Sequence, residues 1–344
     1  MDYKSTGVDI EAGAEVVRRI KGLAQATFTP GVLSEIGAFG GLFHLGAAGG
    51  SDPVLVASAD GVGTKLKVAF MMNRHTTIGE DLVNHCVNDI LVQGARPLFF
   101  LDYLATGRLS PDVAVEIVEG LARACRDNGC ALLGGETAEM PGFYLDREYD
   151  LAGFIVGMVE RDRVITGQQI AEGDVLIGLP SSGLHTNGYS LARRIVFDTL
   201  MFGVHDVIPE LGGSIGDVLL TPHRSYLRPV LPLVDARMIR GLAHITGGGL
   251  TDNVPRILPS GLNARIDRSA WQVPPVFSWL VDKGDVPEAD AWRTFNMGIG
   301  LVLVVERSRA PEVLKQLHEG GEPGALVIGD IAAGTGTVEY VRRS

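Results

Sequence analysis

Residues 53–65 read Pro-Val-Leu-Val-Ala-Ser-Ala-Asp-Gly-Val-Gly-Thr-Lys, and this stretch decides how the first half of the chain is interpreted. Its apolar part, 53–60, predicts a buried strand. The segment from Asp60 to Lys65 then supplies an acid, two glycines, a hydroxyl and a lysine. At a strand end these groups can assemble a metal–phosphate site, because carboxylates bind Mg²⁺, glycines expose N–H groups and lysine neutralises phosphate. The alternative is a glycine turn with a solvated Asp and Lys.

Outward from this stretch, the first half alternates strands and helices. Ser110-Pro111-Asp112 is a helix start, with a capping Ser and Pro at the first position. The expected helices are 9–24, 78–94 and 110–128, and the expected strands are 53–60, 97–105, 130–135 and 150–160. This order predicts an α+β arrangement with a layer of helices on one sheet.

The second half alternates again after a polar, turn-rich segment at 161–173, which predicts domains 1–165 and 166–344. Strands are expected near 174–179, 241–246, 263–267 and 297–305. Helices are expected near 187–201, 222–235, 275–283 and 310–319. A short strand pair, 325–331 and 337–341, is expected to close the chain.

Composition excludes several classes of protein. The chain has 344 residues, 41 Asp and Glu against 30 Lys and Arg, and a formal net charge of −11. An acidic balance argues against nucleic acid or anionic membrane as a partner. The three cysteines form no Cys-x-x-Cys pair and are expected to be small buried hydrophobes. With no apolar leader and no run of about 18 apolar residues, a cytoplasmic enzyme is expected.

Glycine is unusually frequent, at 45 residues, and falls in short clusters. The sequence contains neither the P-loop string nor Gly-x-Gly-x-x-Gly, so a nucleotide must be held in another way.

The helix expected at 78–94 carries a stripe of polar residues along one face. Its members lie three and four residues apart: Asp81, Asn84, His85, Asn88 and Asp89. Asn and Asp are poor helix formers, so the stripe suggests a ligand-facing role, with Asp89 as the favoured metal ligand. The alternatives are a stripe that meets another helix or subunit and, for His85, a hydrogen-bonded structural histidine.

A third cluster, Gly134-Gly135-Glu136, is expected directly after a buried strand. Together with Asp60 and Asp89, Glu136 makes three carboxylates, each at the end or on the face of a core element. Hard oxygen ligands in this number suit a Mg²⁺ ion that bridges ATP phosphates.

Two further loops each precede a helix and offer N–H and hydroxyl donors to anions. The first spans 181–190, where His185 could donate to a reacting oxygen or be an ordinary loop residue. The second spans 246–253. Their candidate phosphate ligands are Ser182, Gly183, Thr186, Asn187, Gly247, Gly248 and Gly249. Near the N-terminus, Lys21 ends a helix, where a solvated lysine is the ordinary interpretation.

Taken in order, these motifs resemble one family closely, the phosphoribosylformylglycinamidine cyclo-ligases, also called aminoimidazole ribonucleotide synthetases. The matching segments are 3–22, 60–65, 86–89, 98–103, 133–142, 181–191, 246–249 and 295–300. The departures are Leu184, Thr186 and His85, which stand where Pro, Ser and an apolar residue are frequent.

The resemblance implies an α/β fold of two domains, an N-terminal ferredoxin-like sheet domain that dimerises and a C-terminal α/β domain. It implies a homodimer whose active-site cleft uses both domains. It also implies ATP and Mg²⁺, with His185, Lys21 and Lys65 as catalytic residues and Asp60, Asp89 and Glu136 as metal ligands. The remaining ATP or phosphate ligands that we infer are Gly61, Gly63, Thr64, Asn88, Gly134 and Gly135, besides Asp60, Lys65 and the two loops above.

The implied substrate is formylglycinamidine ribonucleotide. ATP phosphorylates its formyl oxygen, and the ribose-bearing nitrogen then attacks the activated carbon and displaces phosphate. Such a reaction asks the protein for positioning and charge neutralisation. The rivals are other ATP enzymes with a similar Asp-Gly-Val-Gly-Thr-Lys site, namely an amidotransferase, a thiamine-phosphate kinase, a selenophosphate synthetase or a hydrogenase maturation factor. A nucleotide-binding paralogue without turnover is the rival from another class.

Overall fold

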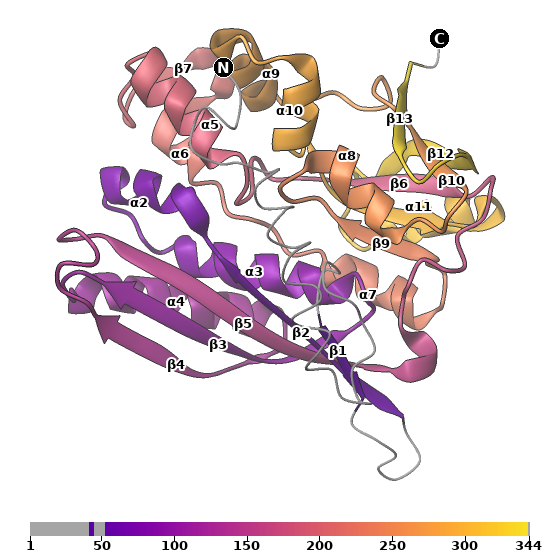
Figure 1. Cartoon of the computed structure of the whole chain (residues 1–344), viewed down its shortest axis with the longest axis horizontal. Coiled ribbons are helices and arrows are strands. Elements are labelled where there is room, and N and C mark those ends of the chain that lie inside the picture. The colour runs from indigo at the N-terminus through magenta and orange to yellow at the C-terminus, as the bar shows by residue number, and fades with distance from the viewer. Residues whose placement is uncertain (1–40, 45–51, 343–344) are drawn as a thin grey trace.

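The computed structural model describes residues 41–44 and 52–342. The helix expected at 9–24, and Lys21 with it, lie outside the described residues. The first part of the chain contributes one sheet and its helices (Figure 1). These elements are β1 (Gly41–His44), β2 (Pro53–Gly61), α2 (Leu66–Met72), α3 (Ile78–Leu91), β3 (Arg96–Thr106), α4 (Pro111–Asp127), β4 (Ala131–Glu139) and β5 (Tyr149–Glu160).

The first sheet has the order β1-β2-β5-β3-β4. All its pairings are antiparallel except β3 with β4, which α4 joins as a crossover. Strand residues alternate between faces, and those of the buried face, such as Val54, Val56 and Ile155, pack towards the helices. The predicted layer of helices on one sheet is confirmed.

Helices α3 and α4 cross at close range because glycine stands on each at the crossing. A Cβ on Gly79 would lie 2.3 Å from the Ile117 carbonyl oxygen, and one on Gly120 would lie 2.5 Å from that of Thr76. Apart from Glu80, every residue of α3 is buried, and the helix lies between the first sheet and the second half of the chain (Figure 1). Its polar stripe therefore faces protein rather than bulk solvent.

The second half builds a six-stranded sheet with the order β13-β10-β12-β6-β11-β9. Its strands are β6 (Val175–Pro180), β9 (Gly241–His244), β10 (Leu262–Asp267), β11 (Ile299–Val305), β12 (Leu326–Ala333) and β13 (Val338–Val341). Every residue of β11 is buried, so both of its faces are covered. The expectation of a closing strand pair is wrong, because β12 and β13 flank β10 on opposite sides instead of pairing with each other.

Helices and a small ribbon surround this sheet. They are α5 (Tyr189–Arg193), which continues as a π-helical segment (Arg194–Thr199), the ribbon β7 (Val207–Ile208) with β8 (Gly213–Ser214), α6 (Ile215–Leu219), α7 (Leu227–Asp235), α8 (Gly249–Asn253), α9 (Pro275–Gly284), α10 (Glu288–Thr294) and α11 (Ala310–Glu319). The predicted domain boundary falls in the connection between β5 and β6.

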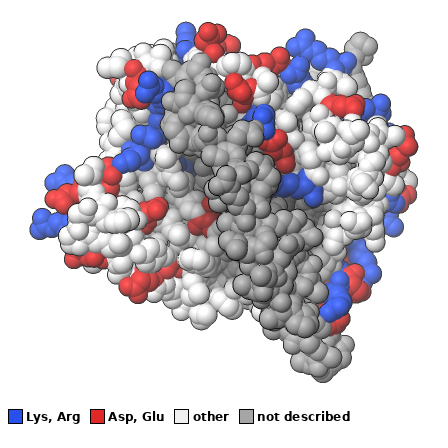
Figure 2. Space-filling view, in the orientation of Figure 1, with Lys and Arg blue, Asp and Glu red and all other residues white. Residues whose placement is uncertain are grey.

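Three surface and core properties bear on function. In Figure 2, the described Lys and Arg residues are interspersed with Asp and Glu, so the described part of this face carries no large field of one sign. All three cysteines are free and buried, as expected. Among the described residues, no helix combines the length and the apolar character that a membrane crossing requires.

Candidate active site at the junction of the two sheets

The end of β2, the stripe of α3 and the loop after β6 meet at one place. Oδ2 of Asp60 lies 2.5 Å from Nε2 of His85, and Nδ1 of the same ring lies 2.7 Å from Oγ1 of Thr186. A second link joins the hydroxyls of Thr64 and Ser190, 3.2 Å apart. The segment 60–65, the polar stripe of α3 and the loop 181–190 are therefore brought together, although about 120 residues separate Asp60 from the loop.

His85 stands between two carboxylates, with Asp60 at 2.5 Å and Asp89 Oδ2 at 3.6 Å. Burial would lower the pKa of His85, but the two carboxylates outweigh it and raise this pKa to about 9. Burial would raise the pKa of Asp60, but the charge of His85 outweighs this effect, so the pKa of Asp60 is lowered. The imidazolium thus favours the ionised form of Asp60 and holds the two acids close together.

Asp89 is fixed on both oxygens. Its Oδ1 accepts a 2.7 Å hydrogen bond from Nδ1 of His244, at the end of β9, and its Oδ2 accepts from the Ser58 hydroxyl at 3.1 Å. Asp89 is nearly buried, whereas 41% of the Asp60 side chain is exposed. Of the two acids, Asp60 is the one that an incoming ligand can reach.

The expectation that Lys65 neutralises a phosphate is not met in this structure. The side chain is fully buried, and its ammonium donates to Asp81 at 2.8 Å and to the carbonyl oxygens of His185 at 3.1 Å and Thr221 at 2.7 Å. Burial lowers the pKa of Lys65 and raises that of Asp81 to about 6, against the attraction between them. We take the pair as ionised, because three acceptors surround the ammonium and Oδ1 of Asp81 also receives the His223 N–H. Lys65 therefore ties two loops of the second half to the first sheet.

Much of the polar stripe of α3 likewise holds the second half of the chain against the first half. Asn84 donates to the His223 carbonyl oxygen at 2.8 Å. Asn88 donates to the Arg224 carbonyl oxygen and accepts from the Tyr226 N–H, both at 2.9 Å. For these residues the structure supports the alternative of a polar stripe that meets another part of the protein. It does not present Asn88 to a nucleotide.

His185 is fully buried and has an unusual backbone. Its φ of 62° lies in the left-handed region, where a non-glycine residue is strained, and this conformation turns its carbonyl oxygen to Lys65. The ring accepts from the Ser182 N–H at 3.1 Å through Nε2, while Nδ1 has no hydrogen-bond partner. Its catalytic role stays a prediction.

The two glycine loops lie side by side. A Cβ on Gly247 would come within 3.3 Å of Oδ1 of Asn187. Gly248 and Gly249 have φ of 99° and 59°, and the Asn253 amide donates to the carbonyl oxygens of Thr246, Gly247 and Gly249 at 2.8–3.3 Å. The second loop is thus held by its glycine backbone conformations and by the Asn253 side chain, and its use as a phosphate site stays a prediction.

Glu136 does not join the other two acids within one chain. Gly134, Gly135 and Glu136 belong to strand β4, which is exposed rather than buried and continues to Glu139 instead of ending near 135. Across the sheet, Gly61 is in register with Ala152, Tyr103 and then Glu136, three strand spacings or about 14 Å away. Asp60 shares its face with Gly135, so the adjacent Glu136 lies on the opposite face of the sheet.

A cavity of about 880 Å³ opens elsewhere, between α2, α4 and the end of β3. Phe70, His75 and Tyr149 contribute to its lining. It contains none of the predicted site residues, and we assign the chemistry to the junction, where those residues gather.

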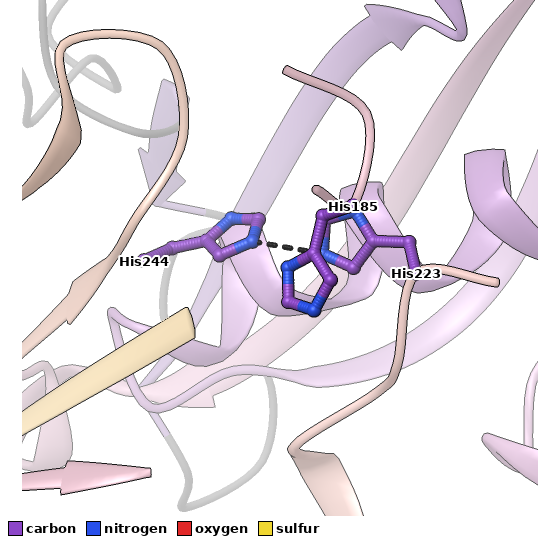
Figure 3. A group of neighbouring side chains, drawn as sticks. All are labelled: His185, His223 and His244. Carbon is purple, nitrogen blue, oxygen red and sulfur yellow. Dashed lines mark hydrogen bonds between the residues drawn. The ribbon is translucent and has the colours of Figure 1, made fainter. Parts of the chain in front are cut away.

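Two buried histidines at the junction were missed at the sequence level. His223 precedes α7, and His244 ends β9 directly before the second glycine loop. Figure 3 shows them facing each other beside His185. The position of His244 at the end of a strand before a glycine loop was a usable signal. Nothing in the sequence around His223 marked it.

Comparison with known proteins agrees with this architecture. Residues 43–159 match the family model of the AIR synthase related protein N-terminal domain, and residues 171–342 match that of the C-terminal domain. Among curated proteins, the phosphoribosylformylglycinamidine cyclo-ligase of Trichlorobacter lovleyi is 55% identical over 96% of this chain and 94% of its own length. That of Alkaliphilus metalliredigens is 50% identical over 97% and 96%.

Solved structures share the fold at lower identity. A thiamine-monophosphate kinase from Stenotrophomonas maltophilia has a TM-score of 0.63 at 18% identity, covering 94% of this chain and 95% of its own. The hydrogenase maturation protein HypE from E. coli has a TM-score of 0.60 at 21% identity, covering 84% of each chain. Matches to both domain models and full-length identity above 50% establish the relationship: the chain belongs to the AIR synthase related family, with the phosphoribosylformylglycinamidine cyclo-ligases as its full-length relatives.

Proposed function

We propose that this protein is an ATP-dependent cyclo-ligase of purine biosynthesis. It converts 2-formamido-N1-(5-phospho-D-ribosyl)acetamidine and ATP to 5-amino-1-(5-phospho-D-ribosyl)imidazole, ADP and phosphate. The formyl oxygen attacks the γ-phosphorus and releases ADP. The ribosyl nitrogen then attacks the formyl carbon, loses its proton, and phosphate leaves with the former formyl oxygen.

One observation carries this proposal. In a chain 55% identical to a named cyclo-ligase over 96% of its length, motifs from both halves converge on Asp60, His85 and the 181–188 loop. The related fold alone would not distinguish a kinase from a ligase, because those neighbours share at most 21% identity.

ATP as the co-substrate has support from the same fold. One thiamine-monophosphate kinase structure is described as complexed with AMPPCP and TMP, and one HypE structure as complexed with ATP. The site also fits Mg²⁺, which commonly takes one or two carboxylates besides phosphate oxygens. Asp60, through its exposed side, would hold the ion, whose chemistry is to neutralise charge on the ATP phosphates. Asp89 would join it by giving up the Ser58 hydrogen bond to its Oδ2.

The chain's own residues divide the remaining work. Lys65 acts as a positioning residue, because its ammonium holds the carbonyl oxygens of His185 and Thr221. The loops 181–188 and 246–249 supply N–H groups, which bind the phosphate of the ribose and the phosphates of ATP. His185 is proposed to support the transferring phosphoryl group, either by a hydrogen bond or by shaping its loop.

A homodimer through the first sheet is part of the proposal, with domains 1–165 and 166–344. The sheet face opposite α3 exposes apolar side chains in its centre, with Phe154 at 44% exposure on β5. A second copy would cover this face. Glu136 lies on that same face, so a metal role for it requires the partner chain.

The direct test is to supply the acetamidine ribonucleotide, ATP and Mg²⁺ to purified protein and measure the imidazole product and ADP together. We expect one ADP for each ring closed, and no product in excess chelator. Thiamine phosphate offered under the same conditions should not be phosphorylated. Phosphorylation of thiamine phosphate without ring closure would assign the chain to the kinase branch, and ATP binding without either product would make it a non-catalytic paralogue. We propose that the reaction takes place in the cytoplasm.

A further inference from the structure

Three imidazoles from the second half of the chain meet next to the paired acids Asp60 and Asp89. His185, His223 and His244 are each fully buried, and one nitrogen from each lies within 4.8 Å of one nitrogen from the other two. They come from three different segments and converge as Figure 3 shows. Nε2 of His223 and Nε2 of His244 are 3.1 Å apart.

The neighbours of these rings show which of their nitrogens face each other. Asp89 accepts from Nδ1 of His244, so that ring presents an Nε2 lone pair. Nδ1 of His85 is bonded to the Thr186 hydroxyl, which also lies 3.3 Å from Nδ1 of His223. When that hydroxyl donates to His223, the proton of His223 lies on Nε2 and is donated to His244 across the 3.1 Å gap. A metal ion that entered this gap would replace that one proton and take a lone pair from each ring.

We propose that His223 and His244, with His185 as third ligand, form a binding site for a divalent transition-metal ion of the Zn²⁺ or Co²⁺ class. With metal–nitrogen bonds of about 2.0–2.1 Å, two ligands of a tetrahedral ion lie about 3.3 Å apart, close to the separation found here. Three imidazoles favour this class of ion over Mg²⁺, which prefers oxygen.

The surroundings are those of a metal site. The contact from His244 to Asp89 is the carboxylate–histidine pair that orients metal-binding imidazoles. Nδ1 of His223 faces the Thr186 hydroxyl at 3.3 Å in the same way.

His185 needs one rearrangement to serve as third ligand. Its ring is stacked on that of His223, with centroids 4.0 Å apart and planes 18° apart. While Nε2 accepts from the Ser182 N–H, the ring proton resides on Nδ1, buried without a partner. Moving this proton to Nε2 and turning the ring makes Nδ1 a ligand, and breaks both the Ser182 hydrogen bond and the stacking on His223.

The test titrates Co²⁺ into tag-free, dialysed full-length protein with excess Mg²⁺ present and follows visible absorption, with metal content measured separately by mass spectrometry. We expect one Co²⁺ per chain in the wild type. His223→Gln should abolish binding. His75→Gln removes a buried histidine outside the cluster, bonded to Tyr149, and should bind as the wild type does. Zn²⁺ should raise the melting temperature of the wild type and of His75→Gln, but not that of His223→Gln.

Titration of the wild type keeps the proposal testable even if His223→Gln fails to fold. No Co²⁺ binding by the wild type would show that a shared proton fills the gap, and would overturn the proposal. A second group of possible ligands, His85, Asp89 and His244, lies next to the first. Binding that survives His223→Gln but is lost in His85→Gln and in Asp60→Asn would move the ion to the paired acids and equally overturn the assignment. These readouts need no substrate, so they stand apart from the ring-closure assay.

Discussion

The ammonium nitrogen of Lys65 lies 2.8 Å from Oδ1 of Asp81, and neither side chain has any exposed surface. The pair joins the segment after β2 to α3, and through two carbonyl oxygens it also joins both to the second half of the chain. The sequence predicted that this lysine binds phosphate, whereas in the structure it connects the two sheets. Removing either partner leaves the other as an uncompensated buried charge.

Lys65→Met is expected to lower the free energy of unfolding by about 3–5 kcal/mol for this reason. The matched control is Lys67→Met, two residues on. Lys67 pairs with Glu148 at a half-exposed position, where an ion pair contributes at most about 1 kcal/mol. Urea unfolding of the three proteins gives the comparison. A Lys65→Met protein as stable as the wild type, yet inactive, would support the phosphate-binding role for Lys65 instead.

Asp89→Asn is expected to reduce turnover strongly, with a cost on the order of 2–4 kcal/mol in transition-state stabilisation if Mg²⁺ is displaced. The fold should survive, because an Asn Oδ1 can still accept from Nδ1 of His244. Steady-state kinetics over a range of Mg²⁺ concentrations is the measurement, with Asp162→Asn, at an exposed ion pair, as the control. Wild-type kinetics in Asp89→Asn would leave this residue as a structural partner of His244 alone.

His185→Ala separates a catalytic from a structural role. If His185 donates to charge that develops only in the transition state, kcat and kcat/KM should fall by equal factors, typically about 10² to 10⁴. We expect this outcome, accompanied by some loss of thermal stability because the ring is fully buried. Kinetics corrected for the folded fraction, beside a melting curve, checks it. Normal turnover of the folded fraction with lowered stability would show that the residue only shapes its loop.

Phe154→Glu is expected to convert the proposed dimer to a monomer, because it places a charge in the centre of the exposed sheet face. Val207→Glu is the control, since Val207 is 68% exposed but belongs to the second half. Sedimentation velocity at several concentrations measures the assembly. A wild type that sediments as a monomer throughout, or a Phe154→Glu protein that remains a dimer, would remove this face as the interface.

Sequence patterns located most elements because those elements obey local rules. Strands 53–60 and 97–105 were marked by apolar runs, and α4 by its Ser-Pro-Asp start. The sequence predicted a strand that ends near 135, but β4 continues to Glu139. The pairing of that strand with β3 is a contact between residues more than thirty positions apart, which no local pattern encodes. The same reason explains the wrong pairing expected for β12 and β13.

The sequence by itself determined the family, the order of strands and helices, and the kinds of groups available to the site. These follow from residue types and spacing along the chain. Tertiary structure alone decided which of those groups meet: Asp60 with His85, Lys65 with Asp81, and His223 with His244. It also separated Glu136 from the other two acids, because alternate strand residues face opposite sides of a sheet. The role of a charged residue depends on burial and on distant partners, and both exist only once the chain has folded.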